Sequence, residues 1–321
     1  KTSLMGIVFL LVYNILISLK EVVSGHIVQA LSPFLLVFLT FTFCGIVFQI
    51  ISLIKYRDIY FKPFSDFKTL VKVNISTVGA WVGFFYGVKY LEPAIVSTLA
   101  GGFGPAIATL FQSSLKPIKI KIHPIEKLSA MGILILSVIL SYISLTGMSS
   151  IKLLNAIDIS KGIFLTLLSS VCVVITTYYT KRISDMGCSP PVIMAHRFYL
   201  LTPFSLIFFL LTNEQPILGS ITDNINTILY IAIFGATIPL ILLQYGIKYC
   251  SPLVVLTLLS VCPLFTFLFQ LGDPRLHLSL VSGVFILLTT ILSIISILVS
   301  LKEEKKLETS DIDNSVTQST H

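Results

Sequence analysis

Residues 86–112 of the chain, YGVKYLEPAIVSTLAGGFGPAIATLFQ, have a close copy half a chain later, YGIKYCSPLVVLTLLSVCPLFTFLFQ, at residues 245–270. The two stretches share a Tyr-Gly pair, a Lys-Tyr pair, a proline and a closing glutamine in the same order, which apolar composition alone would not produce. In each copy, one apolar helix is predicted to end at the Lys-Tyr pair and the next to begin at Pro93 or Pro252, because a proline at the first helical position loses no hydrogen bond. The chain is therefore predicted to contain two related halves.

Each copy has a further proline inside its second helix, at Pro105 and Pro263. A proline there removes a backbone hydrogen bond and bends the helix, so both residues are predicted hinges. The first copy has one more residue between its two prolines than the second. The helix geometry before Pro105 and Pro263 is therefore not expected to match.

The composition excludes a soluble globular protein. Of the 321 residues, 55% are hydrophobic and 12% are charged, with a mean hydropathy of +0.95, so too few polar groups exist to cover a water-exposed surface. Apolar runs of about 20 residues, each long enough to cross a bilayer, predict ten transmembrane helices. The first is interpreted as a span rather than a removable signal. The runs lie near residues 4–25, 29–54, 74–90, 93–115, 124–146, 158–182, 188–211, 224–247, 252–270 and 276–301.

Basic residues beside the spans predict the orientation. The loops around 55–72, 116–127 and 181–182 and the tail after 301 carry most of them and are therefore assigned to the cytoplasm. The net charge of +7 is explained by these loops and does not indicate nucleic-acid binding. The opposite loops are assigned only Lys20, Lys89, Lys152, Lys161 and Arg275.

Five spans per half is an odd number, so the second half is expected to be inserted upside down relative to the first. The fold class is therefore an all-α membrane protein with ten transmembrane helices as two inverted five-helix repeats. Residues 1–150 form the first repeat and residues 151–301 the second. Residues 302–321 lose their apolar content and are predicted to be a disordered cytoplasmic tail.

Polar residues in the first span share one helical face. Asn14, Ser18 and Glu21 follow one another at helical spacing. They either line a water-filled cavity or hydrogen-bond a neighbouring helix, and the sequence does not decide between these. The corresponding span of the second half has a similar hydroxyl-rich face with Tyr178 beside it, which favours the cavity.

Arg197 lies about nine residues into its span, roughly 12 Å deep at 1.5 Å per residue. A charge at that depth is costly and usually faces protein interior or water. Three interpretations stay open: a cavity or substrate contact, a structural partner, or a side chain that reaches back to the cytoplasmic face.

Three further residues are candidate substrate contacts in the repeated helices. Trp81, the only tryptophan, and Tyr86 are five residues apart, so at most one of them lines a cavity. Gln244 shares a helical face with Lys248, although Lys89 and Lys248 could simply end their helices at the membrane interface. With Asn14, Tyr178 and Arg197, these three residues complete the predicted substrate-binding set.

No other chemistry has a sequence signature. The five cysteines have no metal-ligand spacing, and neither a Walker loop nor an HExxH motif nor an arguable Ser/His/Asp set is present. We therefore expect no metal, no cofactor and no enzymatic activity. Serine-rich faces on the fifth and tenth spans favour helix packing or a homodimer contact.

The order of these landmarks resembles the ten-helix EamA-type branch of the drug/metabolite transporter superfamily, over about residues 4–301. The resemblance rests on three segments and implies a central cavity formed by spans 1–4 and 6–9, with spans 5 and 10 behind. Departures include Asn14 for the family's glycine, Thr40 at the first-half arginine position and Asp273 for its glutamate. The three segments are Tyr13-Asn14 to Lys20 and Pro33, Pro190 to Arg197-Phe198, and Leu271-Gly272-Asp273 before Gly283.

The resemblance implies a secondary transporter in the bilayer, expected in a bacterial inner (plasma) membrane. It would move a small-molecule substrate such as an amino acid by alternating access, without ATP. Arg197 with the interfacial lysines suggests, as an alternative, an exchanger of anionic or phosphorylated metabolites. A membrane-embedded enzyme or structural subunit is the rival class. Because Glu21 and Glu92 fall near predicted span ends, proton coupling through a buried acid is not expected.

Overall fold

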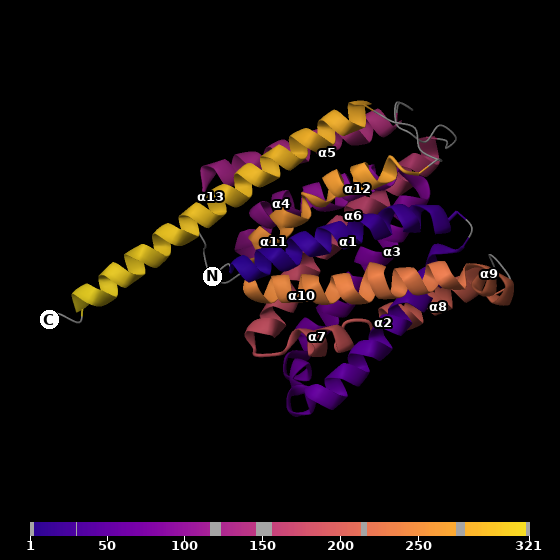
Figure 1. The fold of residues 1–321 in the computed structure, drawn as a ribbon, viewed down its shortest axis with the longest axis horizontal. Helices are drawn as coiled ribbons and strands as arrows, with labels where there is room; N and C mark the ends of the chain where they lie inside the picture. The colour runs from indigo at the N-terminus through magenta and orange to yellow at the C-terminus, as the bar shows by residue number, and fades with distance from the viewer. Residues whose placement is uncertain are drawn as a thin grey trace.

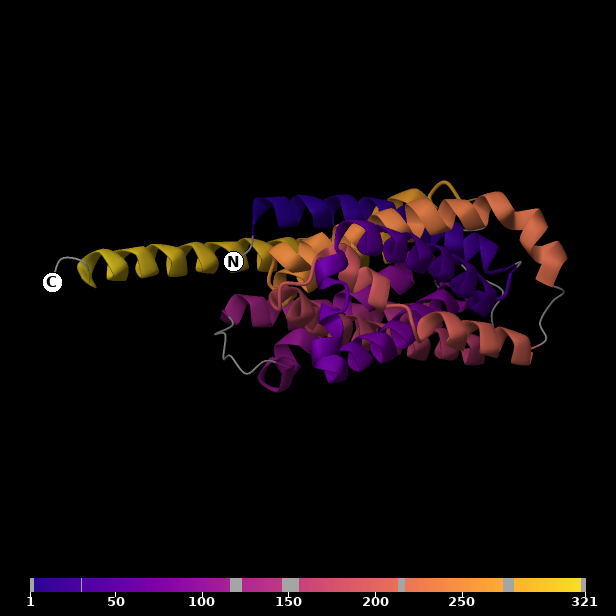
Figure 2. The ribbon, with the colours of Figure 1, turned by 90° about the horizontal axis from the view of Figure 1, so that it is seen from below.

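The computed structural model is a bundle of roughly parallel and antiparallel helices, from which the last helix projects at one end (Figure 1). Every regular element among the described residues is helical. The N-terminus and the end of the last helix emerge at the same end of the bundle (Figures 1 and 2). The structure describes residues 3–29, 31–115, 123–145, 156–212, 217–273 and 280–318.

The first half consists of five uninterrupted helices. Prolines at the first position start three of them, and side-chain caps start two others: Ser3 accepts a hydrogen bond from the Gly6 N–H (3.1 Å) and Asp66 from the Thr69 N–H (3.1 Å). Two short 3₁₀ turns, Arg57–Ile59 and Lys62–Asp66, precede the third helix. The helices are α1 (Leu4–Ile27), α2 (Pro33–Lys55), α3 (Phe67–Tyr90), α4 (Pro93–Leu115) and α5 (Pro124–Leu145).

The second half has the same helix order, but three of its five helices are interrupted. The first interruption divides a helix into α7 and α8, the second is a π-helical segment, and the third separates α11 from α12. Counting each interrupted helix once, the two halves together contain the ten predicted helices. The elements are α6 (Ala156–Asp185), α7 (Pro190–His196), α8 (Leu201–Thr212), α9 (Ile217–Tyr230), the π segment η3 (Ile231–Thr237), α10 (Ile238–Tyr249), α11 (Pro252–Leu259), α12 (Cys262–Gln270) and α13 (Leu280–Gln318).

Seven helices are long and apolar enough, among the described residues, to cross a membrane. The chain is therefore a multi-pass membrane protein, and the ten predicted spans are confirmed as ten helices. The predicted α3, α4 and α5 spans are not among the seven. The seven are Leu4–Ile27, Pro33–Lys55, Ala156–Asp185, Pro190–Thr212, Ile221–Tyr249, Pro252–Gln270 and Leu280–Val299.

Glycines shape the most extensive helix contact among the described residues, between α3 and α6. Gly79, Gly83 and Gly87 recur every fourth residue on α3, and a Cβ at any of them would overlap α6. At Gly83 it would lie 2.5 Å from the backbone oxygen of Leu165. The two helices therefore pack backbone to backbone, as small residues in bilayer helices allow.

Two segments differ from the sequence expectations. Helix α13 continues to Gln318, through most of the region predicted as a disordered tail. Its Lys, Glu and Leu residues are good helix formers, which favours the continuation. Lys20, assigned above to a loop, is in fact an internal residue of α1 and is buried. The assignment to a loop was wrong because it used charge alone, whereas the apolar residues on both sides keep the helix going to Ile27.

Candidate functional site

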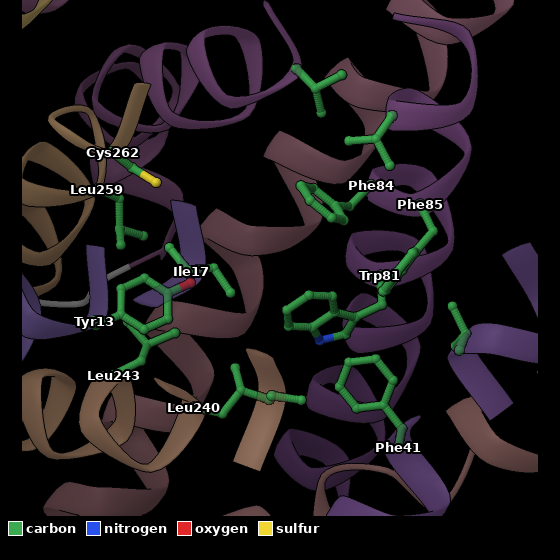
Figure 3. Packing of buried hydrophobic residues seen from close by; sticks show 14 of the residues in the cluster. Tyr13, Ile17, Phe41, Trp81, Phe84, Phe85, Leu240, Leu243, Leu259 and Cys262 are labelled. Carbon is green, nitrogen blue, oxygen red and sulfur yellow. The ribbon is translucent and has the colours of Figure 1, made fainter. Parts of the chain in front are cut away.

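A cavity of about 90 Å³ lies at the centre of the bundle, between helices of the two halves. Figure 3 shows Tyr13 and Ile17 of α1 opposite Trp81 and Phe84 of α3, and all four residues line the cavity. This volume exceeds what a single water needs, so the cavity can hold a small solute or several waters. Three charged residues take part in its lining: Lys20, Glu21 and Arg197.

The Lys20 side chain is only 1% exposed and ends in a cage of aromatic rings. Its Nζ lies 4.5, 3.9 and 4.6 Å from the ring centroids of Trp81, Phe84 and Phe85. Each ring face attracts the ammonium by about 0.5–2 kcal/mol. No hydrogen-bond acceptor among the described residues reaches Nζ. The ammonium is therefore held by rings while its hydrogen-bonding capacity is unused.

The π segment brings a glycine against the stem of Lys20. A Cβ at Gly235 would lie 2.5 Å from Cγ and 3.0 Å from Cβ of that lysine. Because glycine has no Cβ, this stretch leaves the lysine the room it needs to reach the cage. Such π segments inside helices often occur at functional sites.

Glu21 lies next to Lys20 in the sequence but is held by the second half of the chain. The Thr266 hydroxyl donates a 2.6 Å hydrogen bond to its Oε2, and the Cys262 thiol lies 3.9 Å from the same oxygen. The side chain is 6% exposed and lines the cavity. Of the two interpretations left open for the face that carries Glu21, the cavity is the one that holds for this residue. Its position in the sequence did not reveal that α12 packs beside this part of α1.

Arg197 comes directly after α7, where the helix is interrupted before α8 begins. It is 4% exposed and lines the cavity, which agrees with the first of the three interpretations above. Its Nε donates to the Thr77 hydroxyl of α3 at 3.1 Å. Its Nη1 has no hydrogen-bond partner among the described residues.

The interruption that presents Arg197 is held by Asn74 of α3. Its side-chain amide donates to the His196 carbonyl (2.9 Å), and its oxygen accepts from the Leu200 N–H (3.2 Å). These are backbone groups that an interrupted helix leaves without their usual partners. Sequence reasoning missed Asn74, and its only signal was an amide in the polar first part of α3, between Lys72 and Ser76.

The six predicted substrate contacts separate into two groups. Trp81 and Arg197 line the cavity, whereas Asn14, Tyr86, Tyr178 and Gln244 are not among its lining residues. Direct substrate contact at these six positions stays a prediction. The four residues outside the lining have the following environments: Asn14 donates to the Leu258 carbonyl at 2.7 Å, Tyr86 packs on the Phe34 ring at 5.1 Å, Tyr178 is buried, and the buried Gln244 amide has no hydrogen-bond partner among the described residues.

The two predicted hinge prolines have different settings. Pro105 lies within the continuous helix α4, while Pro263 follows the interruption between α11 and α12. Because Pro105 has no N–H, the Gly101 carbonyl one turn earlier lacks its helical donor. The Ser260 hydroxyl, located in the opposite interruption, donates to that carbonyl at 2.9 Å. The two proline sites are thus connected directly.

The described residues contain no cluster of three His, Cys, Asp or Glu side chains that could hold a metal ion. The cavity's chemistry is instead that of fixed charges, hydroxyls and aromatic rings. Such a set can bind and orient a charged organic solute, since each buried charge favours a partner of opposite sign.

Comparisons with known proteins agree with this arrangement. Residues 160–302 match the EamA-like transporter family. No curated protein matches the sequence. One solved crystal structure is 17% identical and superposes with a TM-score of 0.66, over 91% of this chain and 96% of its own. At that identity the likeness establishes the fold alone.

Proposed function

We propose, from the EamA-like transporter domain that this chain carries over residues 160–302, that it is a secondary transporter of a small metabolite, an amino acid or a related compound. The observation that carries the proposal is the central cavity, lined by residues of both halves and by Lys20, Glu21 and Arg197. Charged side chains buried at membrane depth characteristically mark substrate or ion pathways.

Alternating access around two inverted repeats is part of the proposal. It is supported by the sequence repeat and by two matching helix contacts between the halves: α3 packs on α6 as α10 packs on α1. In repeat transporters, rocking of one repeat against the other exposes a fixed central site to each side in turn.

Exchange of an anionic or phosphorylated metabolite is the second candidate. Two observations favour it: Lys20 Nζ and Arg197 Nη1 are both buried without hydrogen-bond partners among the described residues. An oxyanion in the cavity would supply acceptors for both groups.

Transport by the purified protein tests the proposal. Proteoliposomes would be given a labelled panel of neutral, acidic and basic amino acids, dicarboxylates and sugar phosphates, with empty vesicles as the control. We expect uptake or exchange of at least one amino-acid class. Movement of phosphorylated compounds alone would favour the second candidate, and movement of nothing across the panel would transfer support to a membrane-embedded enzyme or structural subunit.

The orientation belongs to the same proposal: both termini and the segment 55–72 lie in the cytoplasm, in a bacterial inner membrane. The exposed position Lys68 offers a test by single-cysteine labelling in a background without native cysteines. An impermeant thiol reagent should not reach Cys at position 68 in intact cells. The serine-rich faces of α5 and α13 pack against each other within one chain, and Ser137 and Ser293 are buried there, which favours the helix-packing alternative over a homodimer contact.

A further inference from the structure

The cavity has an unequal set of charges. Among the described lining residues, Lys20 and Arg197 are cations and Glu21 is the single acid, so the fixed charge sums to one positive. All three side chains are at most 6% exposed. Because water solvates them so little, a bound solute of complementary charge is the natural partner for them.

The three charges occupy two levels of the cavity. Helix α3 provides a scale, since Thr77 holds Arg197 while the ring of Phe84 contacts Lys20. Seven residues separate these two anchors, which is roughly 10 Å along the helix axis. Glu21, adjacent to Lys20 on α1, belongs to the second level. The site therefore has an Arg197 end and an opposite end where a cation and an acid occur together.

Within the part of the chain that the structure describes, the unused hydrogen-bonding groups of the three side chains match their charges: the two cations have free donors, and the acid has free acceptor sites. Arg197 Nη1 and Lys20 Nζ have no acceptor among the described residues, so each can take a carboxylate oxygen. Glu21 already accepts from Thr266 through Oε2 and, as a carboxylate, retains further acceptor sites for an ammonium. Beside its hydroxyls, the cavity lining includes apolar residues such as Ile17 and Leu243, which suit a short hydrocarbon spacer.

We infer, building on the proposed transport function, that the substrate is an amino dicarboxylate with a net charge of minus one. One carboxylate would pair with Arg197. The other carboxylate and the ammonium would pair with Lys20 and Glu21 at the opposite end. Two carboxylates and one ammonium match two cations and one acid, so every buried charge gains a partner of opposite sign.

Three five-carbon probes separate the contribution of the second carboxylate from that of the ammonium in wild-type proteoliposomes. Glutamate has both carboxylates and the ammonium, glutamine lacks the second carboxylate, and glutarate lacks the ammonium. Leaving a buried charge unpaired weakens binding by at least about tenfold. Glutamate is therefore expected to have an apparent KM at least about tenfold below that of either analogue.

Single-charge variants test the assignment of each end. Arg197→Gln should raise the KM for glutamate towards that for glutamine and leave the KM for glutamine nearly unchanged. Glu21→Gln should remove the preference for glutamate over glutarate. Lys161→Gln and Asp158→Asn change a cation and an acid of an ion pair on the outer part of α6, and both should keep the wild-type order of the probes.

The wild-type KM values test the inference even if a variant does not fold. Equal KM values for glutamate and glutamine, or for glutamate and glutarate, would overturn the inference. If neutral amino acids move well while glutamate does not, the inference fails and the proposed transport function stands. If none of the broad panel moves, both fail.

Discussion

The two halves of the molecule differ in the continuity of their helices. In the first half, α2, α3 and α4 are uninterrupted, whereas each counterpart in the second half is broken: α7 from α8, α9 from α10 by a π segment, and α11 from α12. The cavity lies between the halves and is lined from both.

Each interruption of the second half adjoins a charged residue of the cavity. The first presents Arg197, the second places Gly235 against Lys20, and the third comes directly before Cys262, which approaches Glu21. The continuous helices provide the groups that hold these irregular segments. The comparison therefore teaches that a regular half supports an irregular half, and that the charge chemistry concentrates where the two meet.

The largest expected effect on transport comes from substituting Arg197. Thr40 occupies the corresponding position of the first half in the family pattern that the sequence resembles. Arg197→Gln should reduce substrate transport by at least about tenfold at limiting substrate, because a buried charge pair is lost. Thr40 is buried, and its hydroxyl has no hydrogen-bond partner among the described residues. Thr40→Val should therefore transport normally. Uptake rates and melting temperatures of both variants check this, and an active, well-folded Arg197→Gln would remove Arg197 from the site.

Asn74 should have the next largest effect, since it joins a continuous helix to an interruption. Asn74→Leu removes the bonds to the His196 carbonyl and the Leu200 N–H, at a cost of about 1–3 kcal/mol for the groups left unpaired. The melting temperature and the transport rate should both fall. Asn74→Asp keeps the acceptor for Leu200 and should lose less of each. Equal losses in the two variants would show that the bond to Leu200 contributes little.

Replacing either hinge proline should reduce transport by a smaller factor, and the reduction should differ between the two repeats. Pro263→Ala adds a backbone donor beside an interruption and should extend α12 towards α11, which lowers transport several-fold while expression holds. Pro105→Ala adds a donor in a helix that is already continuous, so its effect should be weaker. Uptake assays on both variants measure the difference. Normal transport by both would exclude a hinge role for either proline.

The smallest effect concerns the start of α3, outside the membrane-spanning part. Hydrogen bonds from Thr69, with a contribution from Arg182 at 2.7 Å, lower the pKa of Asp66. A lowered folded-state pKa stabilises the fold above the usual value of about 4 and loses that contribution as the pH falls through the lowered value. Asp66→Asn should therefore melt slightly below wild type at pH 7, with the difference lost as the pH falls through the lowered pKa of Asp66. A difference independent of pH would mean that the charge is irrelevant.

The sequence predicted the helices better than the site. Apolar runs and prolines are local signals, so all ten helices begin within seven residues of the starts of the predicted spans. Arg197 was identifiable because a charge nine residues into an apolar run is conspicuous on its own. Glu21 could be placed on a polar face of the first span, but not beside Thr266. Lys20 and Asn74 were not identifiable, because Gly235 and the α7–α8 interruption reach them only in the folded chain.

The long separation between Glu21 and its partner has a consequence for how the chain is made. Helix α1 leaves the ribosome before the second half of the chain, with Lys20 and Glu21 inside it, and a charge in a helix that enters the bilayer alone costs up to about 2.5–3.5 kcal/mol. Thr266 follows 245 residues later. During synthesis, α1 is therefore only weakly stable in the bilayer until the second half is made. Its stable insertion depends on contacts with that half. A truncated nascent chain that ends before α9 should consequently retain α1 less firmly in the membrane than the full-length protein does.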